Sequence, residues 1–174
     1  MSSYRVRKMR RIIAIDVGYK VTGVACADLT HDGSPEIHLL TTVLSDFGDK
    51  PDEYMRKIQE CLENVVRPKD LILLERMVSK NFKVTARNRA IRTYYESKNV
   101  FVQDLLPTQK VGVNKKKNAD RKKQSVSIAE EVLLGTGWFE TFQRLPRNHD
   151  VADALLMIEY IRHNPDKIKK AAQT

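Results

Sequence analysis

The sequence predicts an α/β fold in which a mixed five-stranded sheet is flanked by helices. Two observations lead to this prediction. Short apolar segments rich in Ile, Val and Leu, typical of strands, alternate along the 174-residue chain with segments whose apolar residues recur at helical spacing. The apolar fraction of 41% is that of a globular protein, and a chain of this length can bury one core. We therefore expect a single domain over residues 1–174, with mobile ends near 1–10 and 164–174.

The first three strands are expected at residues 11–18, 21–29 and 36–45. The first is a continuous β-branched apolar segment, RIIAIDVG, typical of a strand buried on both faces. The turn signal Asp32-Gly33 separates the second strand from the third. These strands should form an antiparallel three-strand meander, to which later parallel strands are added.

The rest of the chain alternates helices with two more strands. Tyr54, Ile58 and Leu62 recur at helical spacing after Pro51, which suits a first helical position. The apolar segment DLILLE is typical of a second buried strand. The expected elements are a helix at 51–66, a strand at 70–75, a helix at 84–98, a strand at 100–106, and helices near 120–134, 138–144 and 150–162.

Charge and cysteine content narrow the class of protein. The net charge is +9, and residues 115–123, KKKNADRKK, hold six basic residues in nine. Such a segment is typical of nucleic-acid binding, although a solvated face has the same appearance. No apolar run is long enough to predict a membrane partner. Cys26 and Cys61 show no metal-binding spacing, which favours free thiols in a reducing intracellular compartment, the cytoplasm, or the host cytoplasm if the source is viral.

Two acidic residues end apolar strands. Asp16 follows Ile12-Ile13-Ala14-Ile15, and Glu75 follows Leu71-Ile72-Leu73-Leu74. A carboxylate carried by a core strand costs several kcal/mol unless a cation or hydrogen-bond donors meet it. A strand end that reaches water is the ordinary alternative. Two such residues at the carboxyl ends of separate strands favour a functional site, because open sheets with helices place their sites there.

A second pair of acids lies on the last helix. Asp150 and Asp153 are three residues apart in HDVADALLM, so both project from one helical face. An acidic bias at a helix N-terminus explains them equally well when they are taken alone. Together, the four carboxylates suit Mg²⁺, which binds carboxylate oxygens and retains sites for substrate phosphates. A basic protein with an acidic metal site is a combination suited to cutting a polyanion.

Three segments resemble RuvC-type Holliday-junction resolvases, and they occur in the family's order. They are IDVGYKVTGVA at 15–25, LLERMVSKN at 73–81 and HDVADALLM at 149–157. Within the family the chain looks most similar to the poxvirus resolvases, because ADRKKQSV at 119–126 and the HDVAD helix resemble their equivalent segments. The resemblance implies an RNase H-like fold, a homodimer that binds a four-way DNA junction, and paired incisions on opposing strands.

The resemblance also implies roles for individual residues. Asp16, Glu75, Asp150 and Asp153 would be the catalytic ligands of two Mg²⁺ ions, with Mn²⁺ as a substitute. Lys123 would assist them beside the scissile phosphate, because Arg121-Lys122-Lys123 crowd a predicted helix start where positive charge opposes the helix dipole unless a phosphate lies there. The residues expected to bind nucleic acid are Lys80, Lys83, Arg87, Lys110, Lys115, Lys116, Lys117, Arg121, Lys122 and Lys123.

Several alternatives stay open at this stage. The chain could be an RNase H-type or YqgF-like nuclease acting on RNA or an RNA–DNA hybrid, or a non-catalytic basic module that binds branched nucleic acid. The apolar flank of the helix at 84–98, with Ile91 and Tyr94, could face a partner subunit or the core. Phe82 could enter a base step of the junction or simply be packed. His149 has no assigned role.

Overall fold

The computed structural model describes residues 10–30, 34–45, 50–76, 81–107 and 117–168. At its centre is a five-stranded sheet in the order β3-β2-β1-β4-β5. Strands β1 (Arg10–Asp16), β2 (Val21–Leu29) and β3 (Pro35–Leu44) form an antiparallel meander. Strand β4 (Leu71–Glu75) pairs with β1 in parallel, and β5 (Phe101–Leu105) pairs with β4 in parallel. The predicted mixed sheet, a meander extended by parallel strands, is confirmed.

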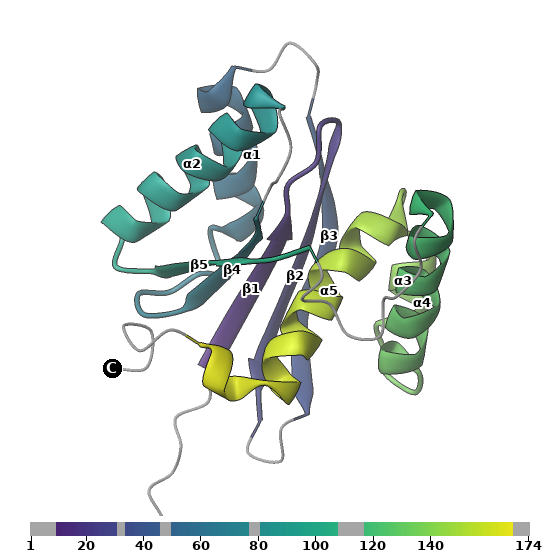
Figure 1. Ribbon diagram of the computed structural model, residues 1–174. Helices are drawn as coiled ribbons and strands as arrows, with labels where there is room; N and C mark the ends of the chain where they lie inside the picture. The colour runs from purple at the N-terminus through teal and green to yellow at the C-terminus, as the bar shows by residue number, and fades with distance from the viewer. Residues whose placement is uncertain (1–9, 31–33, 46–49, 77–80, 108–116, 169–174) are drawn as a thin grey trace, which may run out of the picture.

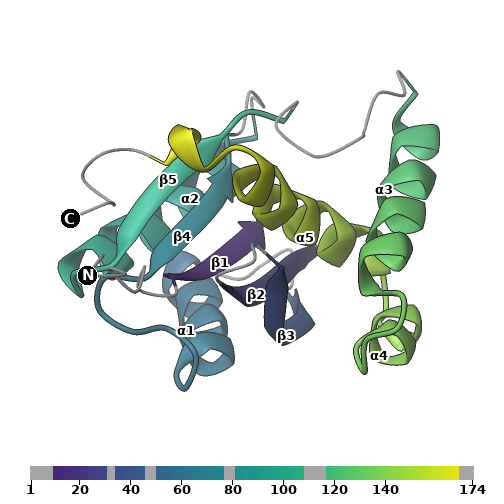
Figure 2. The ribbon, with the colours of Figure 1, turned by 90° about the horizontal axis from the view of Figure 1, so that it is seen from below.

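Helices cover both faces of this sheet (Figures 1 and 2). Helices α1 (Pro51–Leu62) and α2 (Phe82–Ser97) lie on one face. Helix α5 (Asn148–His163) lies on the other, where it packs mainly on β1 and β2. Helices α3 (Asn118–Leu133) and α4 (Phe139–Arg144) form an outer flank against α5. No helix in the described ranges is long and apolar enough to cross a bilayer.

The alternation of side chains along β1 explains its continuous apolar sequence. Ile12 and Ala14 belong to the core under α5, whereas Ile13 and Ile15 belong to the core under α1 and α2. All four are fully buried. A strand with helices on both faces must be apolar at every position, since successive side chains point to opposite faces.

Small residues on β1 and β2 let α5 approach the sheet closely. Ala14, Ala25 and Ala27 lie in the core beneath the helix. At Gly23 the approach is closest, because an added Cβ would collide with the backbone of Asp150 and Val151. Gly23 is also the register partner of Asp16. The glycine therefore brings the start of α5 directly beside the carboxyl end of β1.

The helix ends differ from the expected ones by a few residues, for local reasons. Helix α2 begins two residues early because the Asn81 side chain accepts hydrogen bonds from the amides of Lys83 and Val84, at 3.1 and 3.4 Å. Helix α1 ends at Leu62 rather than at residue 66, since the next two apolar residues, Val65 and Val66, turn back to the Leu62 carbonyl. Residues 164–168, expected to be mobile, include a short 3₁₀ helix, Pro165–Lys167, that brings the Ile168 side chain into the core.

Candidate active site

The four acidic residues singled out in the sequence line one cavity. Asp16 and Glu75 lie at the carboxyl ends of the neighbouring strands β1 and β4, which run parallel and so end at the same edge of the sheet. Asp150 and Asp153 come from the first turns of α5, on the side that approaches β1. The cavity has a volume of about 230 Å³. Its other lining residues are Val17, Pro107, Asn118, Arg121, Lys122 and Ser125.

The turn after Asp16 is held in place by a buried arginine. Gly18 permits the turn, because an added Cβ would collide with the Val21 carbonyl. The guanidinium of Arg87 reaches across from α2 and donates hydrogen bonds to the carbonyls of Gly18 (3.0 Å) and Tyr19 (2.8 Å). The backbone that carries Asp16 is thus fixed from the α2 side of the sheet.

The expectation that Arg87 binds nucleic acid is wrong. Its side chain is only 2% exposed. Besides the two carbonyls, it donates to the Ser45 hydroxyl (3.0 Å), and it stacks over the Tyr54 ring with 4.5 Å between guanidinium carbon and ring centroid. A guanidinium with these partners is a structural group that ties α2 to the β1–β2 turn and the end of β3. Tyr54 in turn shares a hydrogen bond with Thr22 (2.9 Å).

Asp150 forms an ion pair with Arg147 through one carboxylate oxygen, and the His149 ring lies beside the other. Arg147 Nε lies 2.9 Å from Oδ2, and His149 Nε2 lies 3.3 Å from Oδ1. The Asp150 side chain is 13% exposed, so these partners meet it with little competing water. The carboxylate lies at the N-terminus of α5, where the helix dipole also favours negative charge.

His149 connects this carboxylate to α3. Its Nε2 lies 3.1 Å from the ammonium of Lys122. Burial is the main cause that lowers the His149 pKa below its usual range, and the nearby charges of Lys122 and Arg147 lower it further against the opposing effect of Asp150 and Asp153. The imidazole is therefore neutral at neutral pH, and an unprotonated Nε2 can accept a hydrogen bond from Lys122.

The donor chemistry of the cavity fits a hard divalent cation. Carboxylate oxygens are the ligands that Mg²⁺ uses in proteins. Asp16, Glu75 and Asp153 also take part in hydrogen-bond or electrostatic interactions within the protein. In the described ranges, no three His, Cys, Asp or Glu side chains are already drawn together as a metal-ligand group. A cation bound to Asp150 would compete with Arg147 for this carboxylate.

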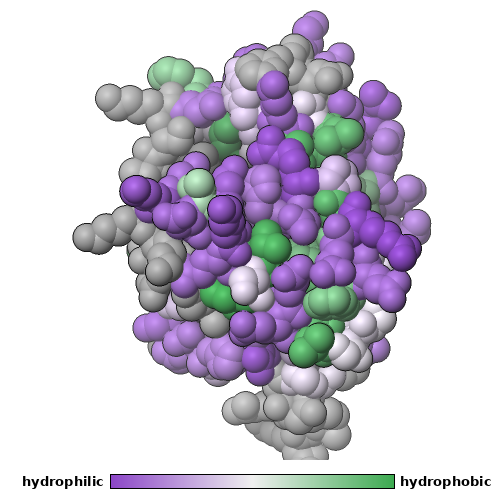
Figure 3. Space-filling view, turned by 90° about the vertical axis from the view of Figure 1, so that its right-hand side faces the viewer, coloured by the Kyte–Doolittle hydropathy of each residue, from purple (hydrophilic) through white to green (hydrophobic). Residues whose placement is uncertain are grey.

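The basic residues near the cavity are arranged by the register of α3. Asn118, Arg121, Lys122 and Ser125 follow helical spacing and all line the carboxylate cavity. Lys123, expected to assist catalysis, is exposed and lines a neighbouring hollow to which Lys122 and His149 also contribute. Lys122 lines both hollows, whereas Lys123 does not line the carboxylate cavity. The α3–α4 side of the molecule is mostly hydrophilic, with small separate apolar patches (Figure 3).

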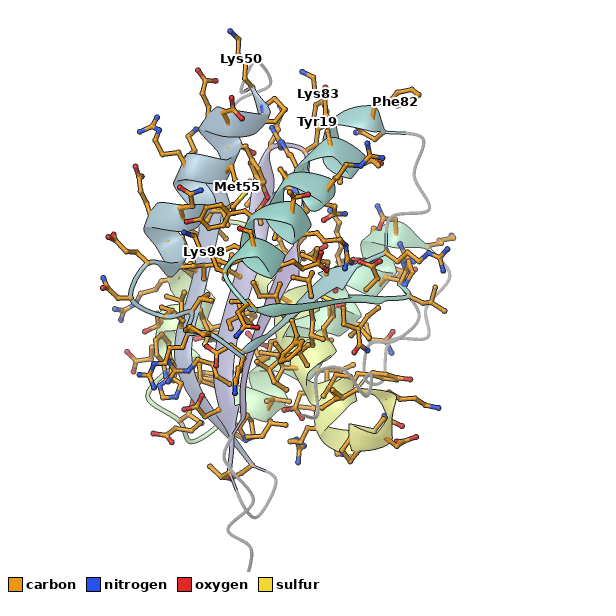
Figure 4. The ribbon with its side chains drawn as sticks, turned by 90° about the vertical axis from the view of Figure 1, so that its left-hand side faces the viewer. Tyr19, Lys50, Met55, Phe82, Lys83 and Lys98 are labelled. Atoms are coloured by element: carbon orange, nitrogen blue, oxygen red, sulfur yellow. The ribbon has the colours of Figure 1, made fainter. Side chains whose placement is uncertain are left out.

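The other predicted nucleic-acid residues are divided between the surface and undescribed segments. Lys80, Lys110, Lys115 and Lys116 lie outside the described residues. Lys117 is exposed at the N-cap of α3. Lys83 is exposed at the start of α2, with its ammonium 5.8 Å from the centre of the Tyr19 ring, as the grouping in Figure 4 shows.

Two open questions on α2 are settled by burial. Phe82 is 88% exposed and projects away from the start of the helix (Figure 4), so it is not an ordinary packed residue. Ile91 is fully buried in the core that also contains Tyr54, and Tyr94 packs against the same core. The apolar flank of α2 is therefore core at Ile91, whereas the half-buried Tyr94 also lines a surface hollow.

Sequence reasoning missed Arg147, Asn118 and Ser125. The helical spacing of Asn118, Lys122 and Ser125 was a readable signal, since buried Ser125, Ala129 and Leu133 mark the inner face of α3. Arg147 precedes the expected helix and shows no periodicity. Only its contact with Asp150 reveals it.

The sheet order and its flanking helices are those of the RNase H-like fold that the sequence predicted. The chain belongs to the poxvirus A22 protein family, whose model matches residues 10–164. The resemblance seen in the sequence is thereby confirmed. No curated protein sequence matches the chain.

Solved structures share this fold at low sequence identity. The fowlpox virus resolvase in complex with Holliday-junction DNA superposes with a TM-score of 0.66 at 16% identity, over 88% of this chain and 98% of that chain. RuvC from Thermus thermophilus with its junction substrate gives 0.64 at 17% identity, over 90% and 96%. The yeast mitochondrial Holliday junction resolvase Ydc2 gives 0.55 at 18% identity, over 95% and 84%.

Proposed function

We propose that this chain is an endonuclease that resolves four-way DNA junctions by magnesium-dependent hydrolysis of phosphodiesters, with paired cuts on opposing strands. The observation that carries the proposal is the cavity in which carboxylates from β1, β4 and α5 meet Arg121 and Lys122 of α3. Acids for cations and bases for phosphates converge there from segments far apart in the sequence.

The roles of the residues follow from their chemistry. Asp16, Glu75, Asp150 and Asp153 would hold two Mg²⁺ ions. When bound, magnesium would activate a water for attack on phosphorus and would stabilise the negative charge on the leaving 3′ oxygen. Because carboxylates alone would repel DNA, the protein also has to attract the scissile phosphate into an acidic cavity.

Lys122 and Arg121 provide that attraction. They lie at the N-terminal part of α3, where unpaired backbone amides and the helix dipole also favour an anion. Neutral His149 accepts a hydrogen bond from Lys122 and so holds its ammonium between the carboxylate cavity and the neighbouring hollow, both of which Lys122 lines. Lys123 would contact the DNA backbone from the adjacent hollow rather than the reacting phosphate.

Observations other than the cavity support the proposed junction substrate and the proposed homodimer. The fowlpox and Thermus proteins that share the fold were solved with Holliday-junction DNA. The net charge of +9 suits a polyanionic partner. Paired incisions need two cavities facing two strands, so we propose that the chain acts as a homodimer. The solvent-exposed Phe82 at the start of α2 is available to enter an opened base step at the junction.

The test is cleavage of a synthetic four-way junction with each strand labelled in turn. In Mg²⁺ we expect symmetric nicks on opposing strands, no cleavage in chelator, and no cleavage by Asp16→Asn, while Asp16→Asn still binds the junction. Glu131→Gln removes an exposed carboxylate of α3 outside the cavity and should cut normally. Normal cutting by Asp16→Asn would show that the site is wrong. An RNA–DNA hybrid cut far faster than the junction would show that the substrate is wrong.

A further inference from the structure

Arg147 adopts a backbone conformation that suits glycine better than arginine. It is the N-cap of α5, with φ 53° and ψ 47° in the left-handed region. A side chain is disfavoured there, because its Cβ crowds the following carbonyl. Only two other non-glycine residues of the described chain have a positive φ, Lys69 and Asn99.

The charge of Arg147 is equally misplaced for helix stability. A cation at a helix N-terminus opposes the dipole, where Ser, Asp or Asn would cap the helix instead. No side-chain cap is formed at this position. The arrangement is compensated by one short ion pair, from Arg147 Nε to Asp150 Oδ2 at 2.9 Å. The compensating partner is thus one of the four acids of the cavity.

The ion pair occupies one of the two Asp150 oxygens and places a positive charge beside the other, so it competes with a cation for this carboxylate. Asp150 is 13% exposed, and its other oxygen faces His149. The Arg147 side chain by contrast is 46% exposed, so it borders the solvent into which it would move. A divalent ion on Asp150 would remove the partner of Arg147 and repel its guanidinium, which would then need another anion.

We propose that Arg147 is a positioning residue that neutralises Asp150 while no metal is bound, and that it transfers to a DNA phosphate when metal binds Asp150. This inference rests on the proposed function for the identity of the second anion. A guanidinium is suited to the exchange, because its planar fork binds a carboxylate or a phosphate with two donors. Arg147 thereby links occupation of the metal site to retention of the DNA.

The first experiment measures metal affinity of the full chain without DNA, by the paramagnetic resonance signal of free Mn²⁺. Arg147→Gln should bind Mn²⁺ roughly threefold to tenfold more tightly than the wild type, because a competing and repelling charge is removed. Arg147→Gly should do the same and also relieves the backbone conformation, so loss of folding cannot account for the result.

The matched control is Arg144→Gln. Arg144 lies three residues before Arg147 and also forms an ion pair. Its partner is Glu140 on α4, and the Arg144 side chain is 81% exposed. It should leave Mn²⁺ affinity unchanged. Equal Mn²⁺ affinity for wild type and both Arg147 variants would overturn the proposal, whether or not the protein cuts junctions.

The second experiment measures junction binding in Ca²⁺ and in chelator. Arg147→Gln should weaken binding severalfold in Ca²⁺, where the guanidinium is released to the DNA, and much less in chelator, where it stays on Asp150. A merely structural role would weaken both alike and would not tighten Mn²⁺ binding. Equal losses in the two conditions would overturn the phosphate half of the proposal. Failure of junction cleavage with tighter Mn²⁺ binding intact would reject the proposed function and retain the ion-pair exchange.

Discussion

Gly23→Ala should disable the cavity without touching an acidic side chain. The new Cβ would lie 2.7 Å from the Val151 nitrogen and closer still to the Asp150 carbonyl, where ordinary contacts begin at 3.4 Å. The start of α5 must therefore retreat from β2 by about 1 Å, and Asp150 with it. A displacement of that size at a reacting centre costs about 10²-fold in rate.

The assay is nicking of the four-way junction under single-turnover conditions, together with Mn²⁺ titration and urea unfolding. We expect cleavage to fall by about 10²-fold and Mn²⁺ affinity to fall with it. Overpacking at this position should cost about 1–3 kcal/mol of stability, so the measurements belong well below the unfolding transition. Gly137→Ala is the control, because its added Cβ meets nothing within 4 Å. Wild-type cleavage by Gly23→Ala would refute the claim that this glycine sets the spacing between Asp150 and Asp16.

Two further variants test the structural roles of charged residues. Arg87→Met should lower the free energy of unfolding by about 2–4 kcal/mol in urea, because it leaves the Gly18 and Tyr19 carbonyls without donors, while junction affinity per folded molecule stays unchanged. Weaker junction binding at unchanged stability would restore a DNA-contact role. The hydrogen bond from Arg11 lowers the pKa of Asp28 in the folded protein. The Asp28 carboxylate therefore stabilises the fold at pH values above its pKa in the unfolded chain. This stabilisation is lost as the pH falls through the lower pKa of the folded protein. Asp28→Asn should thus lower the free energy of unfolding by about 1–2 kcal/mol at pH 7 and leave it unchanged in strong acid. A loss of stability that persists in acid would contradict the ion-pair explanation.

The fold could be predicted because its strands are short and chemically distinct. The central residues of β1 and β4, Ile12–Ile15 and Leu71–Leu74, are apolar without a break, as expected in a sheet covered on both faces. The parallel pairing of these strands is that expected of strands joined through helices. Element ends were less predictable, because they depend on single hydrogen bonds. The Asn81 side chain starts α2, and the Leu62 carbonyl ends α1.

Arg87 could not be interpreted correctly without the fold. Its neighbours on α2 include Lys83, Arg89 and Arg92, so the sequence shows a basic helix. Whether one of these charged side chains points inward depends on whether the neighbouring strand ends present hydrogen-bond acceptors to it. Here two backbone carbonyls in the β1–β2 turn and the Tyr54 ring create a buried place for a guanidinium. The two carbonyls are backbone groups, which leave no trace in residue type, and the Ser45 hydroxyl and the Tyr54 ring are brought to Arg87 only by the fold.

Which of Lys122 and Lys123 lines the carboxylate cavity depends on a rotation of one residue around the helix. Sequence reasoning selected Lys123 because three successive basic residues crowd the start of the helix, and it set that start at residue 120. Helix α3 begins at Asn118, and its inner face is fixed by buried Ser125. Successive side chains differ by about 100° around the helix axis, so Lys122 shares the cavity face with Ser125 whereas Lys123 turns toward the adjacent hollow. Of the lysines in the described residues, we therefore expect Lys122, which lines the carboxylate cavity and contacts His149, to matter most for cleavage.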